Sequence, residues 1–205
     1  MRLKIFLILL LTFWGVKLKG ETKKESQSNK KILMIIAHKD FRDEELMVPK
    51  EYFEQEGWKV TVASTEITEA KGMLGGRIKP DILIDQIDPL SYDALIIVGG
   101  VGSKIYWENQ KIHEIFQSAH EAGKVIGAIC IAPVTLAKAG ILKKKRATCW
   151  ASVSGELKDK GAKYQKKSVV IDGNIVTANG PKAALPFAEK IASLLKSVQN
   201  KSQKE

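Results

Sequence analysis

Cys130 is the residue of this sequence with the clearest potential for covalent chemistry. It follows the apolar, β-branched run Val125–Ile129, which predicts a buried strand, and precedes a helix predicted to begin near Ala132–Pro133. Proline suits the first turn of a helix because its missing N–H would have had no partner there. A thiol at such a turn faces free amides and the positive end of the helix dipole, which stabilise the thiolate. The pattern predicts a nucleophile with a lowered pKa; a buried structural cysteine is the alternative.

A glycine pair, Gly99-Gly100, follows a second apolar run, Ala94–Val98. Glycine allows positive φ angles and close backbone approach. If this turn and the Cys130 turn are neighbours, the N–H groups of Gly100 and Ile131 are placed to bind a developing oxyanion. The pair is incomplete as a phosphate-binding motif, because no Lys-Ser/Thr ending follows it. Ordinary turn glycines are the other interpretation.

The elements that position these residues alternate between strand and helix patterns. Buried strands separated by helices predict an α/β fold with a mostly parallel sheet covered on both faces. Ligands bind at the carboxyl ends of the strands in such folds. The predicted strands are 31–37, 59–64, 75–79, 82–84, 94–98, 125–129, 147–149, 168–171 and 174–177, and the predicted helices are 44–56, 107–122, 133–140, 153–160 and 181–196.

The charge of the chain is unevenly distributed. Of the net charge of +10, more than half falls in residues 1–31, which hold eight Lys/Arg and two Glu. The Lys143–Arg146 run is interpreted as a solvated loop after a helix. Because no basic stripe interleaved with aromatic residues is present, we expect no nucleic-acid partner.

The amino terminus resembles an export signal. Arg2 and Lys4 precede the apolar run Ile5–Val16, which suits a signal core but is short for a bilayer span. We expect an exported protein, periplasmic or extracytoplasmic, tethered to the membrane through residues 5–16 if the signal is not cleaved; a cytoplasmic protein is the alternative. The predicted organisation is a signal peptide or anchor over 1–20, a polar linker over 21–30, one domain over 31–198 and a polar tail over 199–205.

Several motifs, in their order and spacing, resemble the ThiJ/PfpI superfamily over about four-fifths of the chain. This resemblance implies a flavodoxin-like three-layer sandwich, with PfpI-type peptidases and the parkinsonism-associated protein and its glyoxalase and deglycase relatives as family members. The matching segments are Asp43-Glu-Glu-Leu-Met-Val-Pro49, Tyr92-Asp-Ala-Leu-Ile-Ile-Val-Gly-Gly100, Ala128-Ile-Cys-Ile-Ala-Pro133, Ala139-Gly-Ile-Leu142 and Asp172-Gly-Asn-Ile-Val176.

The resemblance also implies roles for individual residues. Cys130 becomes the nucleophile, the amides of Gly100 and Ile131 the oxyanion site, and Glu45 the acid that partners the cysteine. A thiolate and a carboxylate in contact repel, so the pair holds one shared proton and titrates as a unit. We expect Glu45 to be the neutral member; a solvated glutamate in a first helical turn is the alternative.

The sequence departs from the family pattern at several positions. Ile131 stands where PfpI-type peptidases have histidine, and Lys104 stands in the register of a glutamate that they contribute across a subunit interface. Because no histidine base is visible beside Cys130, a Cys–His peptidase is disfavoured. His38 lies near the pocket rim in this interpretation, and His113 and His120 are expected on a helix surface.

Trp150 stands in a short pattern where relatives of the parkinsonism-associated protein often have histidine. Strand alternation points Cys149 away from the pocket if Trp150 faces it, so we expect Trp150 to be an apolar pocket wall and Cys130 to stay free. A Cys130–Cys149 disulfide is the alternative. No spacing of His, Cys or Asp argues for a metal, and we expect no cofactor.

The leading functional hypothesis is a cysteine-dependent enzyme acting on small reactive carbonyls, of the glutathione-independent glyoxalase or deglycase kind. Three alternatives remain: a redox-responsive stress or chaperone-like protein without turnover, a PfpI-type peptidase or amidase, and a degenerate binding module. The resemblance implies a homodimer or a higher homo-oligomer.

Overall fold

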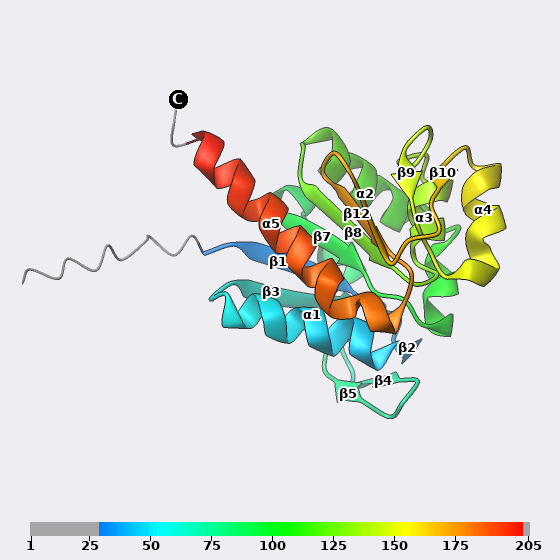
Figure 1. Ribbon diagram of the computed structural model, residues 1–205. Coiled ribbons are helices and arrows are strands. Elements are labelled where there is room, and N and C mark those ends of the chain that lie inside the picture. Colours follow the sequence, from blue (N-terminus) through cyan, green and yellow to red (C-terminus); the bar gives the residue numbers. More distant parts are fainter. Residues whose placement is uncertain (1–28, 203–205) are drawn as a thin grey trace, which may run out of the picture.

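A seven-stranded sheet forms the centre of the computed structural model, which describes residues 29–202 (Figure 1). The strand order is β11-β12-β8-β7-β1-β3-β6, and all neighbours are parallel except the β11–β12 hairpin. The strands are β1 Lys31–Ile35, β3 Lys59–Ser64, β6 Ile82–Leu83, β7 Ala94–Ile97, β8 Val125–Ile129, β11 Val169–Asp172 and β12 Ile175–Ala178.

Helices cover both faces of this sheet. The long helices α1 and α5 lie side by side on one face, and α2 and α3 lie on the other, with α4 beside α3 (Figure 1). This arrangement confirms the predicted flavodoxin-like sandwich. None of the helices within residues 29–202 is long and apolar enough to cross a membrane. The α-helices are α1 Asp43–Gln55, α2 Gln110–Glu121, α3 Pro133–Lys138, α4 Ser154–Asp159 and α5 Ala184–Ser202.

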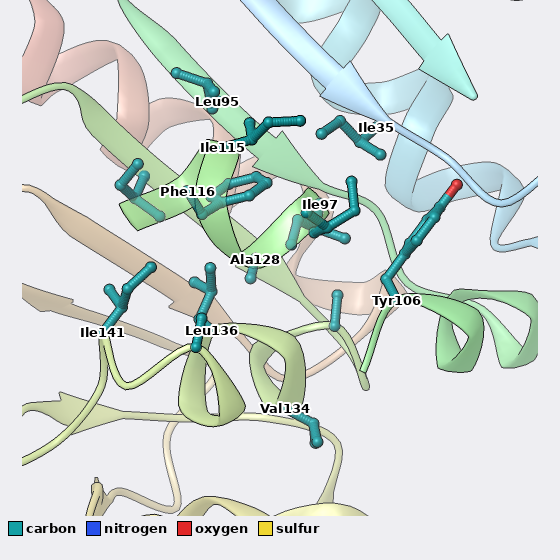
Figure 2. Packing of buried hydrophobic residues seen from close by; sticks show 14 of the residues in the cluster. Ile35, Leu95, Ile97, Tyr106, Ile115, Phe116, Ala128, Val134, Leu136 and Ile141 are labelled. Carbon is teal, nitrogen blue, oxygen red and sulfur yellow. The ribbon is translucent and has the colours of Figure 1, made fainter. Parts of the chain in front are cut away.

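Two apolar cores separate the layers because alternate strand residues point to opposite faces. On β1, Ile32 and Met34 belong to the core under α1 and α5, whereas Leu33 and Ile35 belong to the core under α2 and α3. Figure 2 shows the second core, in which Phe116 of α2 packs among strand and α3 side chains. The side chains of Phe116 and of the four β1 residues 32–35 are fully buried.

Short elements outside the sheet differ most from the sequence prediction. The predicted strand 75–79 is instead part of a small three-stranded sheet in the order β2-β4-β5, and β9 pairs with β10. Strands of two or three residues carry too little hydrophobic periodicity to be recognised. Their bounds are β2 Lys39–Phe41, β4 Ala70–Gly72, β5 Arg77–Ile78, β9 Arg146–Ala147 and β10 Lys163–Tyr164.

Short 3₁₀ helices account for another difference from the sequence prediction. The predicted helix 107–122 begins only at Gln110, because Asn109 caps α2 by accepting a hydrogen bond from the Ile112 N–H at 3.0 Å and a 3₁₀ helix precedes it. The 3₁₀ helices are Ile84–Gln86, Pro89–Ser91, Val101–Tyr106, Ala151–Val153 and Pro181–Ala183.

The ends of the chain bear on the predicted organisation. Residues 1–28, which include the proposed signal and most of the linker, and residues 203–205 lie outside the described residues. Helix α5 continues to Ser202, beyond the predicted domain end at residue 198. Export, a membrane tether and homodimer formation therefore stay predictions.

Candidate active site

Cys130 occupies the turn between β8 and α3, as its sequence context predicts. Its backbone is in the left-handed region with φ of +65°, which is uncommon for a residue other than glycine. Two backbone hydrogen bonds hold this geometry: the Cys130 N–H donates to the Ala178 carbonyl at 2.9 Å, and the Trp150 N–H donates to the Cys130 carbonyl at 2.7 Å. The strained turn presents the thiol at the carboxyl end of the sheet, with the residue 9% exposed.

Glu45 reaches the same place from the first turn of α1. The residue has no exposed surface, and neither carboxyl oxygen makes a hydrogen bond of ordinary geometry with any described residue. The polar groups that face the carboxyl are the Cys130 thiol and the backbone N–H of Gly99. The alternative of a solvated glutamate is therefore wrong, and the expected Cys130–Glu45 contact is present.

Burial controls the protonation of this pair. It raises the pKa of Glu45 to about 8, while the Cys130 thiol and the nearby Arg42 charge act in the opposite direction. Glu45 is therefore protonated at neutral pH, as expected. A buried carboxyl is neutral because charge is poorly solvated in the interior.

The pKa of Cys130 is raised as well, to about 12, first by burial and then by the Glu45 charge. The backbone N–H groups of Gly100 and Ile131 lower it but do not compensate. The predicted lowered pKa is thus wrong in direction. Helix α3 has only six residues, and its amino-terminal dipole is outweighed by desolvation of the sulfur.

The glycine pair is required by close packing. A Cβ atom on Gly99 would overlap Glu45 Oε2 and lie 2.5 Å from Cys130 Cβ, so a side chain there would enter the space between the two groups. Gly100 has φ of +96°, and its Cβ would overlap the backbone of residues 40–42. The Ser103 hydroxyl fixes this turn by donating to the Gly100 carbonyl at 2.9 Å. These contacts exclude the interpretation of Gly99 and Gly100 as ordinary turn glycines.

Trp150 and Cys149 lie on either side of the strand-like segment that follows β9. Trp150 is 47% exposed, and its ring lies against Gly180, where a Cβ would be 2.9 Å from two ring carbons. Cys149 is buried in the core under α2 and α3, whereas Cys130 belongs to the core under α1 and α5. Both thiols are free. The predicted opposite placement of the two cysteines is confirmed.

The three histidines lie away from the sulfur. His113 is buried, with Nε2 2.9 Å from the Trp107 carbonyl, so its predicted surface position is wrong; it lies on the inner face of α2. His120 is half-buried on the same helix. Lys104, at the position of the family glutamate, is exposed with Nζ 5.7 Å from the Trp107 ring centroid.

His38 lines a surface cavity of about 330 Å3 beside the glycine turn. Its Nε2 lies 3.5 Å from Glu66 Oε2. Cys130 is not part of this cavity, so the predicted rim position of His38 does not bring it to the thiol. The cavity is lined by Ala37, His38, Lys39, Asp40, Glu66, Gly102 and Ile105.

Two neighbours of Glu45 have roles that the sequence interpretation missed. Arg42 donates from Nε and Nη2 to the Glu44 carboxylate at 2.8 and 3.0 Å, and its charge opposes the raised pKa of Glu45. Asp43 accepts hydrogen bonds from the N–H groups of Leu74 at 2.8 Å and Gly76 at 2.6 Å, which ties the β4–β5 turn to α1. Three consecutive acidic residues at the start of α1 were the only sequence signal for these roles, because the residues that donate to Asp43 are distant in sequence.

Comparison with known proteins adds to this geometry. An uncharacterized protein of Methanocaldococcus jannaschii is 45% identical over 184 residues, which cover 88% of each chain. Deglycase PfpI of Pyrococcus furiosus is 31% identical over 81% of this chain and 99% of its own. The glutathione-independent glyoxalase DJR-1.2 of Caenorhabditis elegans is 31% identical over 82% of this chain and 90% of its own.

A solved structure shows the same architecture. The ThiJ/PfpI domain protein from Brachyspira murdochii superposes with a TM-score of 0.80 at 33% identity, covering 82% of this chain and 96% of that one. The DJ-1/PfpI family pattern itself matches residues 30–194. With the strand-to-helix cysteine, the buried glutamate and the glycine turn all in place, the chain belongs to the DJ-1/PfpI family.

Proposed function

We propose that this protein is a cysteine-dependent enzyme that converts small reactive carbonyls, as a glutathione-independent glyoxalase or a deglycase. The observation that carries the proposal is the buried pair at the carboxyl end of the sheet: a thiol faced by two backbone N–H groups and by one protonated carboxyl. Relatives named deglycase and glutathione-independent glyoxalase share about a third of the sequence.

The first step is addition of the Cys130 thiol to an aldehyde carbon. The sulfur–carbon bond forms while one oxygen of the Glu45 carboxyl takes the thiol proton and the other gives its proton to the carbonyl oxygen. The product is a hemithioacetal, and Glu45 ends the step protonated as it began. A protonated carboxyl suits this role because it can donate and accept at the same time.

The backbone amides support the same step. The N–H groups of Gly100 and Ile131 face the sulfur, where they stabilise negative charge as the proton leaves. As the new bond forms, that charge moves to the neighbouring carbonyl oxygen. Fixed donors at this position lower the barrier without reorganisation, which is worth about 10²–10³ in rate for each donor.

The later steps for methylglyoxal need further proton transfer. A proton leaves the former aldehyde carbon and another is added at the adjacent carbon, which gives a thioester of lactate; water then releases lactate and the thiol. Glu45 is the carboxyl that faces Cys130 within the described residues, so we assign these transfers to it. We assign the half-exposed Trp150, whose backbone N–H donates to the Cys130 carbonyl, as the pocket wall, a role that would favour a small substrate over a peptide.

Glu45→Gln tests the proposal by separating reactivity from turnover. At about pH 7, where Glu45 is protonated, lactate formation from methylglyoxal should fall by about 10²-fold or more, because glutamine cannot transfer the proton. At about pH 9, where Glu45 is ionised, alkylation of Cys130 by iodoacetamide should become faster in the variant, because the Glu45 charge that raises the pKa of the thiol is gone. The measurements are lactate release and mass-spectrometric alkylation rates.

Glu51→Gln is the matched control, since Glu51 is exposed on the same helix. Glu51→Gln should change neither the rate of lactate formation nor the rate of Cys130 alkylation. Wild-type protein that forms no lactate and deglycates no model adduct would contradict the proposed activity. Equal turnover in wild type and Glu45→Gln would remove Glu45 from the mechanism.

The same contacts favour a second candidate, a redox-responsive protein in which Cys130 is oxidised by peroxide. Two equivalents convert the thiol to sulfenic and then sulfinic acid, with two waters released. In this candidate, the Gly100 and Ile131 amides, which face the sulfur, and the protonated Glu45 would donate hydrogen bonds to the sulfinate. A chaperone-like or stress role would then follow oxidation.

Mild peroxide treatment distinguishes this second candidate. The mass spectrum should show two oxygens added at Cys130 before any oxidation at Cys149, which is 1% exposed. Equal oxidation of the two cysteines would contradict it. A PfpI-type peptidase is less well supported, because none of the described histidines faces the sulfur.

A further inference from the structure

The amino-terminal end of the central sheet is opposite to Cys130 and can be followed as a continuous row of hydrogen bonds. Lys59 N–H donates to the Lys30 carbonyl, Lys31 N–H to the Asp93 carboxylate, and Val125 N–H to the Asp93 carbonyl, at 2.8, 2.8 and 3.1 Å. These contacts join the starts of β3, β1, β7 and β8 in one layer.

The row continues to the small β9–β10 pair. The Asn174 side chain donates to the Lys124 carbonyl at 2.5 Å, and the Arg146 N–H donates to the Asp172 carboxylate at 3.0 Å. Lys163 N–H then donates to the Lys145 carbonyl at 2.7 Å. Segments from seven parts of the sequence therefore follow one another along this end of the sheet.

This end is strongly cationic. Ten Lys/Arg side chains lie along it against five carboxylates. Asp93 is paired with Lys30, and Asp172 with Lys145 and Arg146, while the Asp88 charge acts on Lys124. We call this surface the basic end face; its cations are Lys30, Lys31, Lys59, Lys124, Lys143, Lys144, Lys145, Arg146, Lys160 and Lys163, and its carboxylates are Asp88, Asp93, Glu121, Asp159 and Asp172.

The basic end face is also where the chain enters the domain. Lys31 begins β1 at this end (Figure 1), and the preceding sequence contains further lysines and the apolar run 5–16. Cys130 and the glycine turn lie at the other end of the same strands, beyond Ile129 and Ile97. A flat surface that met the basic end face would leave the candidate active site uncovered.

We propose that the basic end face docks on an anionic lipid surface, with the candidate active site directed away from the bilayer. Lysines held within a Debye length of anionic headgroups are attracted cooperatively with a nearby apolar anchor. Stable membrane association takes two such signals, and the sequence places the apolar run 5–16 ahead of this face, separated from Lys30 by residues 17–29. The proposal does not depend on the reaction at Cys130.

The aromatic residues near the basic end face favour an anionic lipid over a single-stranded nucleic acid as its partner. Binding of single strands uses exposed aromatic rings for base stacking. The aromatic residues near the basic end face are Trp58, which is 7% exposed, and Tyr92 and Tyr164, which are half-buried. Lys158 Nζ lies 5.3 Å from the Tyr164 ring centroid, so that ring is already covered on one side.

Co-sedimentation of the full chain with vesicles tests this proposal. One set contains phosphatidylcholine with an equal part of phosphatidylglycerol, and the other contains phosphatidylcholine alone. Binding to the anionic set should be at least about tenfold tighter and should weaken as NaCl rises from about 0.05 to about 0.5 M. Binding to the neutral vesicles measures the contribution of the apolar run 5–16 in the absence of anionic headgroups.

Two quadruple variants test which lysines are responsible for binding to anionic vesicles. Glutamine at Lys59, Lys143, Lys144 and Lys163 should lower affinity for anionic vesicles about tenfold or more and leave binding to neutral vesicles unchanged. The matched control places glutamine at four exposed lysines outside the basic end face and should change affinity less than about twofold. The control positions are Lys71, Lys79, Lys111 and Lys182. Circular dichroism melts verify that both variants are folded.

Amine footprinting gives a second measurement that needs no substitution. On anionic vesicles, acetylation of Lys59, Lys143 and Lys163 should slow, while Lys71 and Lys182 should react as in solution. Equal losses in the two quadruple variants, or footprints spread over both groups, would overturn the proposal. So would tight binding to a DNA duplex, lost in the end-face variant, with no preference for anionic vesicles.

Discussion

Replacing Cys130 with serine is expected to reduce lactate formation from methylglyoxal by at least about 10³-fold. A serine hydroxyl keeps the shape of the turn, but its proton is far harder to remove than that of a thiol. The site already opposes ionisation, because burial raises the pKa of Cys130 to about 12. The sulfur is therefore the atom whose loss costs the most rate.

Cys149→Ala is the control for this prediction. Cys149 lies in the core under α2 and α3, on the other side of the sheet from Cys130. Removing its sulfur should lower stability modestly, by about 1–2 kcal/mol, and leave lactate formation within about twofold when the assay is done well below the melting temperature. Turnover that survives in Cys130→Ser and is lost in Cys149→Ala would reverse the assignment of the nucleophile.

Glu45→Gln is expected to change the pH dependence of stability as strongly as it changes activity. In the folded protein the pKa of Glu45 is raised to about 8 from 4.5, because the carboxyl is buried. Between these values the folded state holds a proton that the unfolded state has released. Stability of the wild type therefore falls as pH rises from about 5 to about 8.

The size of this loss follows from the shift. One pKa unit corresponds to about 1.4 kcal/mol, so the free energy of unfolding should fall by roughly 3–5 kcal/mol across that window. Glu45→Gln carries no charge at any pH and should remove most of the slope. Urea unfolding at about pH 5, 6.5 and 8 measures the free energy of unfolding of both proteins at each pH.

Glu51→Gln provides the comparison, since it makes the same chemical change at an exposed position of α1. Its stability should follow the wild-type curve. A Glu45→Gln variant with the wild-type slope would show that Glu45 is ionised in the folded protein at neutral pH. The shared proton in the proposed mechanism would then be lost as well.

The predicted effects of Glu45→Gln on activity and on stability reflect one trade-off between catalysis and the free energy of unfolding. A buried ionisable carboxyl lowers stability above neutral pH, and glutamine in its place is expected to relieve that cost while removing proton transfer. Groups that are destabilising where they lie are characteristic of functional sites. The absence of a side chain at Gly99 serves the same site, because any Cβ there would occupy the space between thiol and acid.

Local residue patterns were enough to predict the structure around the thiol and the order of the layers. The runs 125–129 and 94–98 predicted β8 and β7 because buried parallel strands need continuous apolar, β-branched residues. Pro133 and the cysteine before it located the turn, and the family motifs named Glu45. Each of these signals depends on residues close together in the chain.

The protonation state of the site, in contrast, depends on how distant segments pack together. Cys130, Glu45 and Gly99 come from three separated segments, and they come together where the first turn of α1 meets the turns that follow β7 and β8. The prediction of a lowered thiol pKa considered the helix end alone, whereas desolvation by the whole fold reverses the direction. Desolvation depends on contacts between distant segments, which no local pattern of residue types records.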